Sequence, residues 1–501
     1  MTGKQPVPAG DPDVRHQQRA GEGAEGGWAQ RRLRSHIAAL TSASRVTGID
    51  VARALAIIGM IGAHVGFAPE LVWSDPSTWG GVVHGRSAIL FAVLAGVSIA
   101  LVSGGARGVA GSGLDIRQVR LGLVGRGILI FAVGIGLEAL GTSVAVILGV
   151  YGMLFVLSAA FVGWRRRWLL ISASALALLG PALMVVLRAV SAGGGGETMA
   201  IFAYSIYPPL VWLVFVMAGL VVGRSDVRRM RTAVVMLVAG LVLAVAGYGA
   251  GELISPEEDV DEEAYAEDDS FAADGSFLGG TSVDVDDVDL TGHECEIDED
   301  QWVTCYPAED ALAEEWEEIY SEDDALEEEY LDEGEHLDDE SLDSGFADSD
   351  IDESYGSYLR EGLEWDVFRY EALGVYEHSG GTPEIIGSGG FALAVTGLCL
   401  ITFRRALLRR LIFPVAAMGS MPLTAYAAHI VVIRVLAEPW DCVESNMAWF
   451  FLAAGLMLAC ALWALLWGRG PLERLTGWAA HALSAAPRTR NGASAELPLG
   501  R

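Results

Sequence analysis

The chain has 501 residues, of which 52% are hydrophobic, and it carries a formal net charge of −32. Soluble proteins rarely combine such acidity with a mean hydropathy of +0.38, so the composition excludes an ordinary soluble protein. The apolar residues fall into about ten runs of about 17 to 25 residues, the length that an α-helix needs to cross a bilayer. Because backbone polar groups are not hydrated in the bilayer core, these runs must be helical. The sequence predicts an all-α, polytopic membrane protein with about ten transmembrane helices.

The chain begins with a polar, Arg-bearing segment over residues 1–46, which lacks the apolar core of a signal peptide. We expect it to be a disordered cytoplasmic tail. An N-terminal membrane domain of seven spans follows over 47–250, and a C-terminal membrane domain of three spans lies over 386–467, before a cytoplasmic tail over 468–501. The spans are expected at 48–66, 86–103, 119–137, 142–163, 168–189, 206–223, 232–250, 386–403, 411–436 and 447–467.

Arginine clusters predict the orientation of these spans. They lie at 107–126, 164–168, 224–231 and 404–410. Loops rich in Arg and Lys stay on the cytoplasmic side, and all four clusters fall there if the N-terminus is inside. The sequence therefore predicts a multi-pass protein of the cell (plasma) membrane with both termini in the cytoplasm.

An acidic insert over residues 251–385 separates the two membrane domains and is expected to be extracellular. Between Glu252 and Glu384 it holds 49 acidic residues and only two arginines, so the rest of the chain carries about +15. Its low hydrophobicity predicts a disordered or loosely folded segment. Its aspartate runs lack the spacing of a calcium-binding EF-hand, and solvated acidic surface is the favoured interpretation. Cys295 and Cys305 lie where a disulfide is chemically permitted.

The most informative segment is HGRSAILFAVLAGVSIAL, which begins at His84. A histidine and an arginine are costly at the mouth of a membrane helix, so a contact or a reaction must compensate for them. Gly85 allows close approach of the backbone, and Arg86 and Ser87 can bind anions or hydroxyl groups. We expect His84, Arg86 and Ser87 to be catalytic.

Other polar residues are expected at the same outer side of the membrane. His64 ends the first span, His378 lies in a Gly-rich segment before the eighth, and Tyr426 and His429 share one helix face in the ninth. A neutral imidazole there can act as a general base near neutral pH. Tyr426 and His429 are candidate catalytic residues, and His64 and His378 are candidates for substrate binding. For His64, an interfacial polar residue without a function is the alternative.

Asp50 and Arg53 lie at the opposite, cytoplasmic end of the first span. At a spacing of three residues they share one helix face and can pair. They form either a structural ion pair at the helix entrance or part of a substrate-binding site.

Motifs of several other enzyme classes do not occur. The sequence has no Gly-rich phosphate loop with a following Lys, no H-E-x-x-H or paired C-x-x-C, and no convincing G-x-S-x-G. We therefore do not expect an ATPase, a zinc protease or a nucleic-acid-binding protein, and no metal is predicted.

Five segments resemble a known family. TGIDVARALAIIGMIGAHVG and HGRSAILFAVLAGVSIAL resemble the catalytic start of heparan-α-glucosaminide N-acetyltransferase-like proteins. IYPPLVWLVFVMAGLVVGR, EHSGGTPEIIGSGGFALAVTGLCLI and GSMPLTAYAAHIVV resemble the related YeiB-like bacterial membrane proteins. The resemblance implies a transmembrane acyltransferase that uses cytoplasmic acetyl-CoA or another acyl-CoA. It also implies that the family's catalytic histidine is His84, and that its late conserved tyrosine and histidine are Tyr426 and His429.

We therefore expect transfer of an acyl group to an extracytoplasmic sugar, glycolipid or small acceptor, in contact with membrane lipids. Arg107, Arg117 and Arg120 are expected to attract the phosphates of acyl-CoA. One alternative is a membrane transporter or exporter of a lipid or metabolite, which predicts internal repeats that we do not find. Another is a sensor or adhesion-type protein whose acidic insert binds a partner, although ten spans exceed what an anchor needs.

Overall fold

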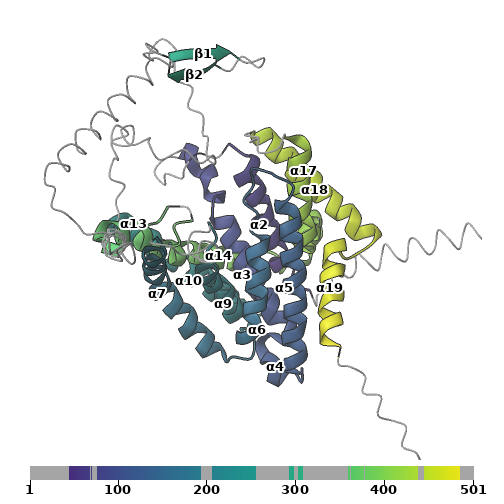
Figure 1. The fold of residues 1–501 in the computed structure, drawn as a ribbon. Coiled ribbons are helices and arrows are strands. Elements are labelled where there is room, and N and C mark those ends of the chain that lie inside the picture. Colours follow the sequence, from purple (N-terminus) through teal and green to yellow (C-terminus); the bar gives the residue numbers. More distant parts are fainter. Residues whose placement is uncertain are drawn as a thin grey trace, which may run out of the picture. The chain divides into compact units, whose positions relative to one another are not determined.

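A computed structural model describes residues 45–67, 69, 76–192, 206–254, 293–297, 303–307, 359–360, 363–376, 378–437 and 445–485. The chain divides into two compact units. One comprises Met1–Glu258 with Glu353–Arg501, and the other is Asp259–Asp352. The described part of the larger unit is helical (Figure 1).

The smaller unit contains an antiparallel hairpin, β1 (His293–Ile297) with β2 (Val303–Pro307). Its register places Cys295 opposite Cys305. The predicted insert, 251–385, extends beyond this unit, because its last part forms helix α13 (Trp365–Leu373) of the larger unit.

Seven helices in the described part are long and apolar enough to cross a membrane. They are α2 (Thr47–Val65), α3 (Arg86–Val102) taken together with the residues from Thr78 onward, α5 (Ile116–Glu138), α7 (Arg166–Ala192), α10 (Met230–Ile254), α14 (Thr382–Thr402) and α18 (Asn446–Leu466). Together with the many exposed leucines, valines and isoleucines on the outer helices, they identify a multi-pass membrane protein.

The other three predicted spans are also helical but depart from simple crossings. α6 (Leu148–Phe161) and α9 (Pro209–Gly223) are shorter apolar helices. α16 (Phe413–Gly419) and α17 (Pro422–Leu436) meet at an angle of 89°. Pro422 favours this break, because proline starts a helix readily but cannot continue one from the preceding turn. Length and composition thus give seven spans, or eight with the bent pair, and ten stays a prediction.

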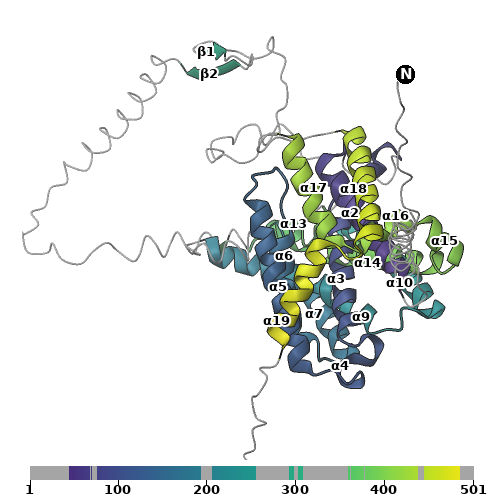
Figure 2. The same ribbon diagram turned by 90° about the vertical axis from the view of Figure 1, so that its right-hand side faces the viewer.

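The remaining described elements lie in loops and near the C-terminus. They are the 3₁₀ helices η1 (Pro76–Val83) and η2 (Gly105–Arg107), and the helices α4 (Gly108–Gly111), α15 (Ala406–Leu411) and α19 (Pro471–Ser484). α19, which the sequence analysis did not predict, lies along α5 (Figures 1 and 2).

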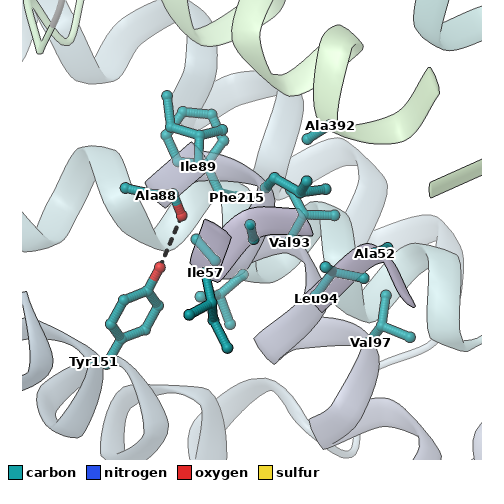
Figure 3. Close-up of a cluster of buried hydrophobic side chains, with 14 of the residues drawn as sticks. Ala52, Ile57, Ala88, Ile89, Val93, Leu94, Val97, Tyr151, Phe215 and Ala392 are labelled. Carbon is teal, nitrogen blue, oxygen red and sulfur yellow. Dashed lines mark hydrogen bonds between the residues drawn. The ribbon is translucent and has the colours of Figure 1, made fainter. Parts of the chain in front are cut away.

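Small residues let the central helices pack closely. At the crossing of α3 and α9, a Cβ atom added to Gly96 would lie 2.1 Å from the Val216 carbonyl oxygen, and one added to Gly219 would lie 2.0 Å from that of Val93. Such close approach of backbones is typical of helix pairs in membranes. Figure 3 shows the core that results, in which the Tyr151 hydroxyl donates to the Ala88 carbonyl over 2.9 Å.

Candidate active site

Four histidines from distant parts of the chain lie close together. His64 ends α2, His84 precedes α3, His378 precedes α14, and His429 lies in α17. The His64 and His429 rings are stacked with centroids 5.8 Å apart. His84 and His378 are close enough to His64 to interact with it electrostatically. The structure therefore brings together the four histidines that the sequence analysis placed at one side of the membrane.

A tight turn brings His84 to the loop that carries His378. Gly85 has φ of +60°, a conformation that glycine adopts at little cost. A Cβ atom at Gly85 would lie 3.9 Å from Cε1 of His378 and 4.0 Å from Oε1 of Glu384. The turn thus sits directly against this loop.

Glu384, which the sequence analysis did not single out, organises the same loop. Its buried carboxylate accepts hydrogen bonds from the backbone N–H of His378 (3.2 Å), the Ser379 hydroxyl (3.1 Å) and the backbone N–H of Gly380 (2.7 Å). The sequence feature that could have identified Glu384 is its position, because it is a carboxylate at the start of an apolar run, just after S-G-G-T-P.

His378 is held in its neutral form. Burial, with a smaller effect of nearby His84, lowers the pKa of His378 to about 4. Its ring meets that of Tyr207 edge to face at 5.5 Å. Near neutral pH this imidazole can therefore accept a hydrogen bond but is rarely charged.

Arg86 and Ser87 are fixed by neighbouring helices. Nε of Arg86 donates to the Tyr248 hydroxyl over 2.9 Å, and that hydroxyl lies 2.8 Å from the Ser388 hydroxyl. Ser87 packs on α2, since a Cβ atom at Gly59 would lie 2.0 Å from its Oγ. Arg86 therefore links α3 to α10 and α14, and Ser87 contacts α2.

Tyr426 and His429 carry polar atoms that lack hydrogen-bond partners in the described part of the chain. Both residues are 0% exposed, and neither the Tyr426 hydroxyl nor either ring nitrogen of His429 is paired. Main-chain groups of Ala425 and Tyr426 lie near the His429 ring, and one of Ile147 lies near the Tyr426 hydroxyl, but none of them meets hydrogen-bond geometry. Because an unpaired buried polar group costs free energy, such atoms suggest a place where a ligand binds.

Asp50 and Arg53 form the predicted pair. Arg53 donates to Asp50 over 3.0 Å and to the Ser98 hydroxyl over 2.6 Å. Arg45 contacts the other Asp50 oxygen at 2.5 Å. Arg53 also faces the cavity described next.

A cavity of about 300 Å³ lies between α2, α3, α5, α6, α17 and α19. Its charged lining consists of Arg53, Arg126, Arg469 and Glu473, and most of the remaining lining is apolar. Arg107, Arg117 and Arg120, which were expected to attract phosphates, are exposed and do not line it.

A series of aromatic rings connects this cavity to the histidines. Phe91 and Tyr151 line the cavity and meet edge to face at 5.3 Å. Phe91 stacks on Tyr426 at 6.5 Å, and Tyr426 meets His429 edge to face at 4.8 Å. The path then ends at His64, which stacks on His429.

The described residues include no group of three or more His, Cys, Asp or Glu side chains arranged to hold a metal ion. The groups assembled here are imidazoles, a phenol and guanidinium groups. They can accept protons, donate hydrogen bonds to a developing oxyanion and bind anions.

Comparison with known proteins agrees with the sequence analysis. Residues 45–252 match the family described as heparan-alpha-glucosaminide N-acetyltransferase, catalytic. This match confirms the expected similarity over α2 to α10, the part that contains His64, His84 and Arg53. No curated protein and no solved structure matches the chain.

Proposed function

We propose that this multi-pass membrane protein, in which residues 45–252 match an acetyltransferase catalytic family, moves an acyl group from cytoplasmic acyl-CoA to an extracytoplasmic acceptor. The acyl group is acetyl or a relative of it, and the acceptor is a sugar, glycolipid or small molecule at the plasma membrane. The observation that carries the proposal is the arginine-lined cavity connected by aromatic rings to four clustered histidines.

The cavity suits the donor. The phosphates of acyl-CoA need cationic partners, and guanidinium groups bind phosphate oxygens through paired hydrogen bonds. Arg53, Arg126 and Arg469 supply three such groups. The apolar remainder of the cavity suits the slender pantetheine arm, which leads the thioester past Phe91 toward Tyr426. The exposed Arg107, Arg117 and Arg120 then attract the donor before it enters.

The histidines supply the proton transfer. His84 takes the proton from the acceptor hydroxyl or amine as that atom bonds to the thioester carbonyl carbon. The Tyr426 hydroxyl, which has no other partner in the described region, donates to the carbonyl oxygen as negative charge develops there. The C–S bond then breaks, and the CoA thiolate takes the proton from His84. His64, His378 and His429 surround the acceptor and position it.

The proposal is tested with purified protein in detergent, labelled acetyl-CoA and a panel of sugar and lipid acceptors. His84→Ala should lower acyl transfer by about 10²-fold or more, because general base catalysis contributes that much. His481→Ala changes an exposed histidine of α19 and serves as the control. Wild-type turnover in His84→Ala would refute the role of His84, and no CoA release with any acceptor would count against the proposed activity.

A transporter or exporter is the second candidate, and the break between α16 and α17 favours it. Discontinuous helices form substrate sites in many transporters. Flux of a labelled lipid or metabolite through proteoliposomes without acyl-CoA distinguishes this candidate from the acyltransferase.

A further inference from the structure

A second pocket, separate from the cavity, gathers four arginines. It has a volume of about 180 Å³ and lies where the start of α2, the segment between α9 and α10, the end of α14 and α15 meet. We call it the arginine pocket, and its polar lining includes Arg45, Arg228, Arg404, Arg409 and Thr47. The proposed acyl transfer uses none of these residues.

The lining of this pocket is rich in positive charge. Its described lining residues include four arginines and no Asp or Glu. Asp50 is a nearby acid, and it contacts both Arg45 at 2.5 Å and Arg53 at 3.0 Å. In the described part of the chain Arg404 and Arg409 form no ion pair, so a bound anion would balance their charge.

Two buried polar atoms among the lining residues lack a hydrogen-bond partner in the described part of the chain. They are Oγ1 of Thr47, a residue only 4% exposed, and Nε of Arg409. Both atoms can donate a hydrogen bond, and such donors are normally paired when buried. An anion in the pocket supplies the acceptors that they lack.

The backbone adds to this preference for anions. Thr47 is the first residue of α2, and no side chain caps that N-terminus. The free N–H groups of a helix N-terminus carry partial positive charge and favour an anion. This helix end is held rigidly, since a Cβ atom at Gly48 would lie 2.7 Å from the Cys399 carbonyl oxygen of α14.

We propose that the arginine pocket binds a phosphate group. Guanidinium groups bind phosphate oxygens through paired, charge-assisted hydrogen bonds. Pockets for drug-sized ligands begin at about 300 Å³, so this pocket suits a phosphate or a small headgroup and not a whole nucleotide. The phosphate comes either from an anionic phospholipid or from free phosphate ion. The lipid source fits the end of the helices that the arginine clusters predict to be cytoplasmic, where such lipids are abundant.

The test measures binding to the full-length protein with two probes. In detergent, inorganic phosphate is titrated while the thermal midpoint is recorded. In nanodiscs, lipids retained by the protein are counted by native mass spectrometry, with phosphatidylglycerol mixed into phosphatidylcholine. Free phosphate is the source if phosphate ion raises the midpoint, and a lipid headgroup is the source if phosphatidylglycerol is selectively retained.

The variants decide whether the pocket is responsible. The double variant Arg404→Gln/Arg409→Gln should weaken binding of whichever probe binds the wild type by about tenfold or more. Thr47→Val, which keeps the side-chain shape, should weaken it by a few fold. The control, Arg165→Gln/Arg166→Gln, changes two exposed arginines elsewhere and should bind like the wild type. If both probes fail with the wild type, or if the control and the pocket variants lose binding equally, the proposal is wrong. Thr47→Val keeps the test valid if the double variant does not fold.

Discussion

The hydroxyl of Tyr426 is fully buried and has no hydrogen-bond partner in the described region. Tyr151, a short distance away through Phe91, differs in this respect, because its buried hydroxyl donates to the Ala88 carbonyl over 2.9 Å. A protein gains no stability from an unpaired buried hydroxyl. The Tyr426 hydroxyl therefore fits a role in which it donates a hydrogen bond only when substrate is bound. Replacing each tyrosine by phenylalanine should therefore have different effects on stability and activity.

Tyr426→Phe should leave the thermal midpoint unchanged or slightly raised, because the lost hydroxyl has no partner to leave behind. If the hydroxyl stabilises the oxyanion, kcat for acyl transfer falls by about 10²-fold while KM for acyl-CoA changes little. Tyr151→Phe should lower the midpoint instead, since it leaves the Ala88 carbonyl unpaired. Differential scanning fluorimetry and steady-state kinetics on both variants measure these effects. Equal kcat values for Tyr426→Phe and the wild type would exclude the oxyanion role.

At the residue scale, the sequence predicts some polar residues well and others not at all. His64, His84, His378 and His429 attract attention because a histidine in or beside an apolar run is costly. Their clustering follows from topology, since each is expected at the same end of its span. By contrast, Glu384 resembles any acid of the preceding insert, and only its three hydrogen bonds reveal that it shapes the loop of His378.

At the scale of elements, α3 and α9 pack very closely where they cross through Gly96 and Gly219. Any Cβ atom added there meets a backbone carbonyl at about 2 Å, and backbone cannot move aside as a flexible side chain can. Gly136 in α5 is the contrasting case, because a Cβ atom there meets nothing within 4 Å. Substitution of glycine by alanine should therefore change the thermal midpoint in opposite directions at these sites.

Gly96→Ala and Gly219→Ala should each lower the thermal midpoint clearly and reduce the yield of folded protein, because the two helices must separate. Gly136→Ala should leave the midpoint unchanged or raise it, since alanine favours a helix over glycine by about 1 kcal/mol. Midpoints measured in one detergent for all three variants provide the comparison. A tolerated Gly219→Ala would show that this crossing is looser than described.

The apolar runs predict where helices form but not how each one ends or bends. Every predicted span contains a helix, because a continuous apolar run in a bilayer has no other stable backbone structure. The break before Pro422 lies where α16 packs on α2 and Gly419 approaches the Asp50 carbonyl closely. α19 was not predicted because it is amphipathic, with Glu473 and Arg474 in its first turn. A search for uniformly apolar runs does not detect such helices.

At the scale of the whole molecule, six helices from distant parts of the sequence enclose the cavity. Arg53 and Arg126 come from α2 and α5, while Arg469 and Glu473 come from near the C-terminus. No spacing in the sequence relates these positions, so the cavity becomes visible only in three dimensions. The family match ends at residue 252, whereas Tyr426, His429 and Arg469 lie beyond it. If the proposed chemistry is correct, the matched segment alone is not a complete enzyme.

The division into two units gives a test of what the acidic insert does. Asp259–Asp352 forms a unit of its own, whereas α13 packs with the membrane helices, and Arg188 of α7 pairs with its Glu371 over 3.1 Å. Replacing Asp259–Asp352 by a flexible Gly-Ser linker should leave the thermal midpoint and acyl transfer within about twofold of the wild type, because it removes no described residue of the larger unit.

A longer deletion that also removes α13 serves as the contrast, and it should lower the midpoint because it breaks the contact of Glu371 with Arg188. Loss of acyl transfer in the shorter deletion, with an unchanged midpoint, would instead assign acceptor binding to the insert. CoA release without added acceptor separates the two cases, because slow transfer to water needs only the membrane helices. Retained release with lost acceptor-dependent turnover would therefore place the catalytic groups in the larger unit and acceptor recruitment in the smaller one.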